Sequence, residues 1–127
     1  MDGFKRYVKE NGLHNGIYVC DDQVAEKSGN HWFLIYVEDD NVNFVDSFAK
    51  EPSFYGIELK PLKKLPFQLQ SLLSDVCGEY TLFFSYHLSR DYKLEQIYKL
   101  FSKTNVFKND ERVQNFVHKK FPGHKRI

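Results

Sequence analysis

The sequence predicts an α+β fold, a small mixed β-sheet packed against helices, in a single domain that spans residues 1–127. Two patterns predict this class: strand-like apolar runs fill most of the first half of the chain, and helical periodicities fill the second half. A length of 127 residues suits one domain. With 42% hydrophobic and 17% aromatic residues, the chain can fill one compact core.

Composition narrows the classes of function. The charge balance, 18 Lys and Arg against 17 Asp and Glu, neither demands a nucleic-acid partner nor excludes one. No apolar run has the length of a membrane span and no signal pattern opens the chain, so we expect an intracellular protein without membrane contact. The two cysteines, Cys20 and Cys77, cannot make a disulfide framework or a four-ligand zinc site, and we expect neither metal nor cofactor.

The chain begins with a predicted short helix over residues 2–10. Phe4, Tyr7 and Val8 recur there at helical spacing and share one apolar face. A short strand over residues 16–20 follows, because this run is apolar and β-branched.

A hairpin is expected after a polar loop over residues 21–30. Residues 31–37 form a nearly continuous β-branched and aromatic run, which is typical of a central strand buried on both faces. A four-residue polar turn over residues 38–41 leads to a second arm over residues 42–48. The two arms should pair antiparallel.

The middle of the chain is predicted to connect the hairpin to the elements that follow it. Residues 49–66 contain Pro52, Pro61 and Pro66, so we expect a surface segment without regular structure. Residues 67–71 alternate between apolar and polar side chains and predict one more strand.

Helices dominate the rest of the chain. Residues 80–88 are the most apolar helical segment, and residues 92–101 carry an apolar stripe at i, i+3, i+4 and i+7. Asn109 and Asp110 are suited to cap a final helix. The basic tail over residues 119–127 should be frayed.

Cys77 is the first candidate for chemistry, because it lies at the start of the core helix. The N–H groups and partial positive charge at a helix N-terminus stabilise a thiolate. The alternative is a cysteine that only packs in the core, as free cysteines usually do. The choice depends on whether the chain also supplies a base, an orienting group and an oxyanion donor.

Hairpin geometry supplies the base and the orienting group. If the turn centres near residues 39–40, the start of the first arm pairs with the end of the second, with residue numbers that add to about 78. This pairing puts His31 beside Ser47 and within one residue of Asp46. His87 lies roughly 15 Å along the helix from Cys77, too far to serve as its base. The alternative is an ordinary surface contact between His31 and Asp46.

Gln70 is the candidate oxyanion donor. An oxyanion hole needs neutral donors aimed at the developing charge, and the Gln70 amide together with the Cys77 backbone N–H would provide them. The alternative is a polar residue at a strand end.

These residues resemble the adenovirus-type (adenain-like) cysteine proteases, in particular those of Polinton/Maverick elements and related viruses. The order His, Asp or Glu, Gln, Cys is shared with the wider clan that includes the SUMO-specific proteases. The resemblance covers roughly residues 16–118. The motifs that carry it are His31-Trp32, Val45-Asp46-Ser47-Phe48, Leu69-Gln70-Ser71 and Cys77-Gly78-Glu79-Tyr80, followed by Asn109-Asp110-Glu111-Arg112-Val113 and Phe116-Val117.

The resemblance implies a fold and a mechanism. It implies a papain-like, adenain-like core in which Cys77 attacks a peptide carbonyl, His31 moves the proton, Asp46 orients His31 and Gln70 supports the oxyanion. Two substrate-binding residues are also implied. Trp32 would pack beside the histidine, with a core aromatic as the alternative, and Gly78 would let the backbone approach the sulfur.

The resemblance further implies a polypeptide substrate, a viral or mobile-element structural precursor cleaved near glycine. The enzyme would then work inside the cell, in the virion or in the host nucleus. The chain is shorter than adenovirus protease before His31 and after Cys77, and its lead-in to the histidine is reduced to residues 24–29. No residue here carries over the DNA or peptide activator of that family. Lys60, Lys63 and Lys64 are suited to meet DNA, and the alternative is a solvated basic surface.

Two other functions stay open at this point. The same residues would serve an isopeptidase that acts on a ubiquitin-like or SUMO-like tail, although the short chain leaves little room to hold such a partner. A binding protein that keeps the fold without turnover is the third reading.

Overall fold

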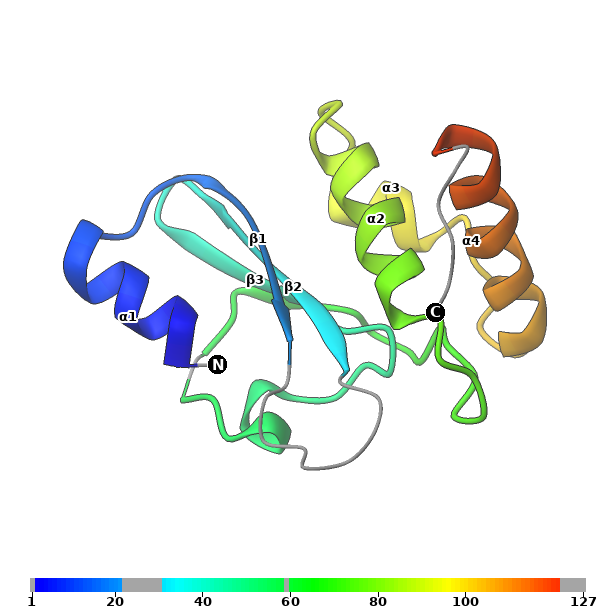
Figure 1. Cartoon of the computed structure of the whole chain (residues 1–127), viewed down its shortest axis with the longest axis horizontal. Helices are drawn as coiled ribbons and strands as arrows, with labels where there is room; N and C mark the ends of the chain where they lie inside the picture. Colours follow the sequence, from blue (N-terminus) through cyan, green and yellow to red (C-terminus); the bar gives the residue numbers. More distant parts are fainter. Residues whose placement is uncertain (1, 22–30, 59, 122–127) are drawn as a thin grey trace.

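The computed structural model describes residues 2–21, 31–58 and 60–121 and has the predicted α+β class (Figure 1). Its four-stranded sheet has the order β1-β2-β3-β4. Three strands pair antiparallel and the short fourth pairs parallel with the third, so the sheet is mixed. The strands are β1 (Gly16–Asp21), β2 (Trp32–Glu38), β3 (Asn41–Val45) and β4 (Lys63–Lys64).

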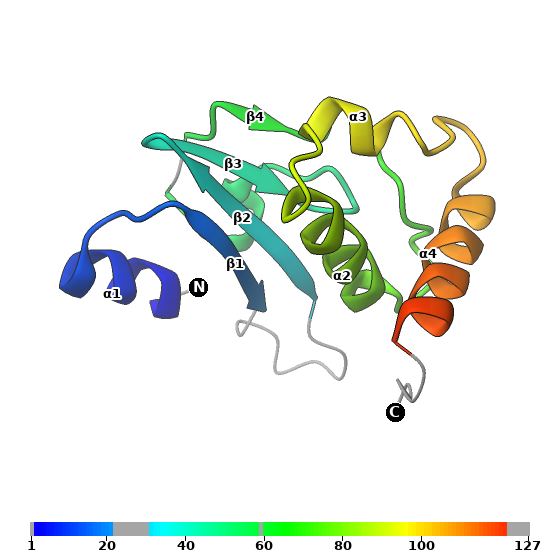
Figure 2. The same cartoon turned by 90° about the horizontal axis from the view of Figure 1, so that it is seen from above.

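Helices flank this sheet unevenly. Three of them, α2, α3 and α4, gather together beside one part of the sheet, and α1 lies apart near β1 (Figures 1 and 2). No helix within the described ranges is long and apolar enough to cross a membrane. The helices are α1 (Asp2–Asn11), α2 (Cys77–Leu88), α3 (Leu94–Tyr98) and α4 (Val106–Lys120), with one 3₁₀ helix, η1 (Pro52–Tyr55).

Strand β2 is buried on both faces, as its apolar run predicts. Leu34 packs into the core beneath the helices. Phe33 and Ile35, which point to the opposite face, pack into a second cluster that includes Tyr55 of η1. Because successive residues of a strand face opposite sides, one continuous apolar strand can serve both cores.

The β2–β3 turn is tighter than predicted. Asp39 and Asp40 have φ values of 51° and 66° and form a two-residue turn, for which aspartate is one of the tolerant residues. Glu38 pairs with Asn41, so paired residue numbers add to 79 and the predicted register is wrong by one residue. The regular pairing ends at Leu34 and Val45.

The predicted strand over residues 67–71 is wrong. The backbone amides of Leu69 and Gln70 both donate to the carbonyl of Ser47, at 2.8 and 3.0 Å. Two donors on one carbonyl do not form the ladder of hydrogen bonds that pairs two strands. The apolar alternation there reflects burial of Leu69 without strand pairing. The connection over residues 49–66 is also more regular than predicted, because it contains η1 and β4.

Both helices after α2 differ from their predicted bounds. The apolar stripe over residues 92–101 forms only the short α3. Helix α4 begins at Val106, and Asn105 caps it by accepting a 3.1 Å bond from the amide of Lys108. Asn109 and Asp110 therefore lie inside the helix and are buried, so their predicted role as caps is wrong.

The predicted tail is wrong in part. Lys119 and Lys120 belong to α4 and are not frayed, and residues 122–127 lie outside the described residues. The predicted loop and lead-in to His31 also fall outside the described residues, from residue 22 to residue 30.

Candidate active site

Three elements place the candidate catalytic residues. His31 immediately precedes β2, Asp46 immediately follows β3, and Cys77 is the first residue of α2. The antiparallel pairing of β2 and β3 puts the start of one strand beside the end of the other. Helix α2 packs on β2, which brings its N-terminus to the same end of the hairpin.

The imidazole of His31 is bonded to the carboxylate of Asp46. The distance between His31 Nε2 and Asp46 Oδ1 is 2.5 Å, and Asp46 is only 1% exposed. The hydroxyl of Tyr55 and the backbone amide of Lys50 donate to Asp46 Oδ2 at 2.6 and 3.0 Å. The amide of Phe48 donates to Oδ1 at 3.3 Å. The carboxylate is therefore fixed from several sides before it orients the imidazole.

Two aromatic rings stack on the imidazole of His31. Its ring centroid lies 4.7 Å from that of Phe48 and 5.4 Å from that of Tyr55, with interplanar angles of 26° and 22°. The side chain of His31 is 13% exposed. The rings limit rotation of the imidazole and shield its bond to Asp46 from water.

The environment of His31 favours its charged form. Burial alone lowers its pKa, but hydrogen bonds to Asp46 and Cys77, and the charges of these two groups, outweigh burial and raise the pKa of His31 to about 9. Since Asp46 holds Nε2, Nδ1 is the ring nitrogen left to exchange a proton with the thiol. Asp46, His31 and Cys77 thus lie in the order that an orienting carboxylate, a base and a nucleophile would need.

The sulfur of Cys77 rests against the start of β2. The backbone amide of Trp32 lies 3.3 Å from Sγ and donates to it. Cys77 is 6% exposed, and the crevice behind it, lined among others by Val45, Tyr80 and Phe84, is too small to hold a water molecule. The amide supports negative charge on sulfur, and the dry apolar wall keeps water away from its inner side.

Trp32 and Gly78 are placed beside the nucleophile. The Trp32 side chain is 41% exposed, so the alternative of a core aromatic is wrong, and the residue lines the crevice together with Cys77. At Gly78 an added Cβ would meet no atom within 4 Å. The chain itself therefore does not require glycine at position 78 for packing.

Gln70 lies next to the site with its amide already engaged. Its side chain is fully buried. Nε2 donates to the carbonyl and the hydroxyl oxygen of Ser74 at 3.2 and 3.3 Å, and Oε1 accepts a 2.5 Å bond from Ser47, which lines the crevice beside Cys77. The bonds to Ser74 are longer than the 2.5 Å bond from Ser47, so they are the weaker contacts of the Gln70 side chain.

A polar anchor on α4 holds the Gln70 segment. Asp110 accepts a 2.8 Å bond from the Tyr80 hydroxyl and a 3.3 Å bond from the amide of Ser71. The side chain of Asn109 donates to the carbonyl of Leu69 at 3.1 Å. These bonds fix the residues on both sides of Gln70.

Sequence reasoning missed four residues that support the site. Phe48 and Tyr55 act on His31 and Asp46, and Asn109 and Asp110 act on the Gln70 segment. Residue spacing does not predict their contacts, because each contact joins segments whose distance is set by the fold. Asn109 and Asp110 match the family motif, and this match could have identified them as supporting residues, but they were interpreted as helix caps.

Other groups suited to chemistry lie elsewhere or do not form a cluster. Cys20 is half-buried on β1, and burial raises the pKa of its thiol to about 11, which keeps the group protonated and unreactive at neutral pH. Within the residues that the structure describes, no group of three or more His, Cys, Asp or Glu side chains is placed to hold a metal ion.

Comparison with known proteins does not assign the chain to a family. No protein-family model matches the chain, and no curated protein matches it. The geometry of Cys77, His31 and Asp46 therefore carries the functional argument.

Proposed function

We propose that this protein is a cysteine endopeptidase. The observation that carries the proposal is the position of His31, which is hydrogen-bonded to Asp46 and whose pKa is raised by its interactions with both Asp46 and Cys77. A nucleophile, a base within hydrogen-bond reach and a group that orients the base are the requirements of covalent acyl transfer.

The proposed reaction uses only these side chains and water. The Cys77 thiolate attacks the scissile carbonyl carbon, and protonated His31 gives its proton to the leaving amine as the C–N bond breaks. Neutral His31 then takes a proton from water, whose oxygen attacks the thioester. The C–S bond breaks, the acid leaves, and the thiolate and imidazolium are restored.

Gln70 has a conditional part in this reaction. The N–H groups of the first helical turn point outward from the N-terminus of α2, where the oxyanion would form. For Gln70 to join them, Nε2 has to leave Ser74 when substrate binds. The gain is a neutral donor for a developing negative charge, the interaction on which oxyanion holes depend.

The finer proposal is an adenain-like enzyme of a virus or a Polinton/Maverick-type element. It rests on the motifs around the four candidate residues. The substrate would be a structural precursor cleaved near glycine, inside the cell, in the virion or in the host nucleus. Trp32, exposed beside Cys77, would contact the substrate chain.

Labelling with a peptidyl vinyl sulfone that carries glycine next to the reactive group tests the proposal. Intact-mass spectrometry should show one adduct, mapped to Cys77 by digestion. Labelling should disappear in Cys77→Ser and fall strongly in His31→Ala. The matched control is Cys20→Ser, which removes the other thiol and should label like the wild type.

Two results would overturn the endopeptidase proposal. One is a Cys77 that stays unlabelled while the chain is folded, as judged by circular dichroism. The other is labelling that His31→Ala leaves unchanged. Parallel digestion of a glycine-containing precursor peptide and a ubiquitin-like fusion then separates an endopeptidase from an isopeptidase, since only the isopeptidase needs the folded ubiquitin-like partner.

A further inference from the structure

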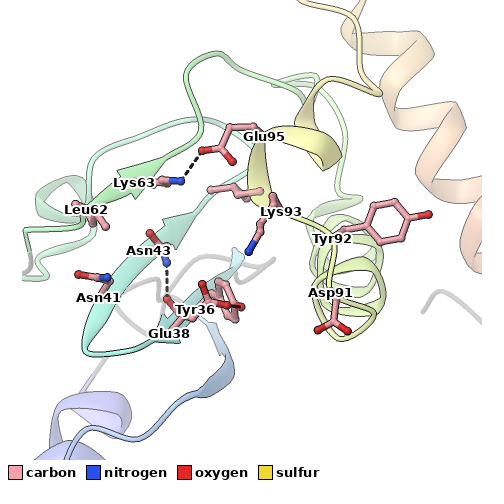
Figure 3. Close-up of a pocket in the computed structure, with 11 residues that line it drawn as sticks. Tyr36, Glu38, Asn41, Asn43, Leu62, Lys63, Asp91, Tyr92, Lys93 and Glu95 are labelled. Atoms are coloured by element: carbon pink, nitrogen blue, oxygen red, sulfur yellow. Dashed lines mark hydrogen bonds and ion pairs between the residues drawn. The ribbon is translucent and has the colours of Figure 1, made fainter.

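A cavity and a crevice lie at opposite ends of the β2–β3 hairpin. The polar cavity of about 190 Å³ lies at the turn end, where Lys63 is paired with Glu95 (Figure 3). None of the candidate catalytic residues lines that cavity. The crevice at the other end is lined by Cys77 and also by Ser47, which directly follows Asp46 in the chain. A further residue for the proposed reaction is therefore to be sought at the crevice.

Ser47 holds both the side chain and the backbone of Gln70. Its hydroxyl donates to Gln70 Oε1 at 2.5 Å, and Ser47 is 4% exposed. The carbonyl of Ser47 accepts the backbone amides of Leu69 and Gln70 at 2.8 and 3.0 Å. Because Gln70 is fully buried, water does not compete for the bond from the hydroxyl.

The Ser47 hydroxyl bonds to the oxygen end of the Gln70 amide, and the nitrogen end faces Ser74. Nε2 donates to the carbonyl of Ser74 at 3.2 Å, and a carbonyl can only accept. A reversed amide would bring two oxygens together there. When Nε2 leaves Ser74, as the proposed reaction requires, the bond from Ser47 still holds Oε1. The amide can then turn its nitrogen toward the oxyanion without losing its orientation.

A donor at Oε1 also strengthens the donor at Nε2. Hydrogen bonds in a chain polarise one another, so an amide whose oxygen accepts a bond carries more positive charge on its N–H₂ group. During the proposed reaction the chain would run from the Ser47 hydroxyl through the Gln70 amide to the oxyanion. Ser47 would therefore act on both the direction and the strength of the neutral donor.

We propose that Ser47 is a positioning residue for the reaction, and that it acts through Gln70. The proposal rests on the proposed endopeptidase function and on Gln70 as the oxyanion donor. Because Asp46 and Ser47 are adjacent, two consecutive residues after β3 then place the base on one side and the oxyanion donor on the other.

Steady-state cleavage of a glycine-containing peptide tests the role of Ser47. Ser47→Ala should lower kcat roughly tenfold with little change in KM, since it removes one neutral hydrogen bond that matters in the transition state. Ser47→Thr keeps the hydroxyl and should retain most of kcat. Ser47→Val has the shape of the threonine variant without the hydroxyl and should not. The matched control is Ser53→Ala, which removes an exposed hydroxyl in η1 and should cleave like the wild type.

Further measurements separate action through Gln70 from action through Asp46 or through the fold. In a Gln70→Ala background, Ser47→Ala should lower kcat no further, because the residue through which it acts is already lost. The pH at which kcat/KM falls and the rate at which iodoacetamide alkylates Cys77 should match the wild type, since neither depends on the oxyanion donor. In ¹H–¹⁵N NMR spectra the side-chain amide of Gln70 should shift in Ser47→Ala and stay unchanged in Ser53→Ala.

The proposal is wrong if Ser47→Ala keeps the kcat of the wild type. It is also wrong if Ser47→Ala lowers kcat equally with and without Gln70, or if Ser47→Thr and Ser47→Val cleave equally. In each of these results the wild type still cleaves, so the endopeptidase proposal stands. Failure of the endopeptidase proposal is a different result: the wild type cleaves no peptide and Cys77 takes no vinyl sulfone label, and the role of Ser47 in the reaction falls with it.

Discussion

The imidazole of His31 lies 2.5 Å from the carboxylate of Asp46, although fifteen positions separate the two residues in the chain. The carboxylate does not depend on this contact for its own position, because Tyr55 and the backbone after β3 hold it independently. The geometry therefore presents the histidine to Cys77 in one fixed orientation. The predictions below test separate parts of this arrangement.

The first prediction concerns activity at high pH. Because the pKa of His31 is raised to about 9, the imidazolium that would protonate the leaving amine in the proposed reaction persists to about that pH. We expect kcat/KM to fall as pH rises through about 9. In Asp46→Asn the hydrogen bond and negative charge that raise the pKa of His31 are reduced, so the fall should move to lower pH. His14→Gln, in an exposed loop, should leave the profile unchanged.

The second prediction concerns stability. A pKa that is higher in the folded chain, about 9 against the ordinary 6.5, means that folding favours protonated His31. This contribution to the free energy of unfolding is fully present below about pH 6.5 and is lost as pH rises through about 9, with a size of at most about 3 kcal/mol. Urea unfolding across this range should show the decline. An equal decline in His31→Gln would contradict the assignment to His31.

The third prediction concerns the hydroxyl of Tyr55. Tyr55→Phe keeps a ring against His31 but removes the 2.6 Å bond to Asp46, a bond to a charged group worth about 1.5–3 kcal/mol. We expect a lower denaturation midpoint and a lower kcat. Tyr7→Phe at an exposed tyrosine of α1 is the control, and an equal effect there would show that Asp46 does not depend on the hydroxyl.

The fourth prediction separates the oxyanion donor from the nucleophile. Gln70→Ala should lower kcat on a peptide by about 10²–10³-fold, the usual cost of one oxyanion donor. Alkylation of Cys77 by iodoacetamide forms no oxyanion, so its rate should change little. If both rates fall together, Gln70 acts only by holding the fold through Ser47 and Ser74.

The fifth prediction concerns the anchor on α4. Asp110→Ala removes the acceptor for Tyr80 and Ser71 and frees the segment that carries Gln70. We expect lower kcat together with lower stability. Hydrogen exchange should become faster at the amide of Ser71. Glu111→Ala, at the exposed neighbouring position, should change none of these quantities.

Much of the fold was predictable because its signals are local. The apolar run of β2, the polar turn after it and the helix that starts at Cys77 each follow from residue type and spacing. The wrong predictions arose where tertiary contacts override local preference. Leu69 alternates like a strand residue but its amide bonds to Ser47, and Asn109 resembles a cap but donates to the carbonyl of Leu69 from within α4.

The candidate site, like the fold, was predictable from the sequence only in part. Hairpin connectivity alone predicts that His31 and Asp46 approach each other, and the register error of one residue did not change that outcome. The sequence could not predict the stacking of Tyr55 on His31 or the hydrogen bond from Gln70 to Ser74, because both depend on how irregular segments fold back on the sheet. Side-chain orientation in such segments has no sequence period.

The two-residue turn at Asp39 and Asp40 contributes no side chain to the candidate site, yet its length determines which residues of β2 and β3 lie opposite each other. Pairing of β2 with β3 runs from this turn to Leu34, roughly 13 Å away. One inserted residue would shift β3 by one step, turn its side chains to the opposite faces and carry Asp46 away from His31. In evolutionary terms, the chain can exchange the residues of this turn among those that tolerate positive φ, such as Asn, Asp and Gly, provided that their number stays at two.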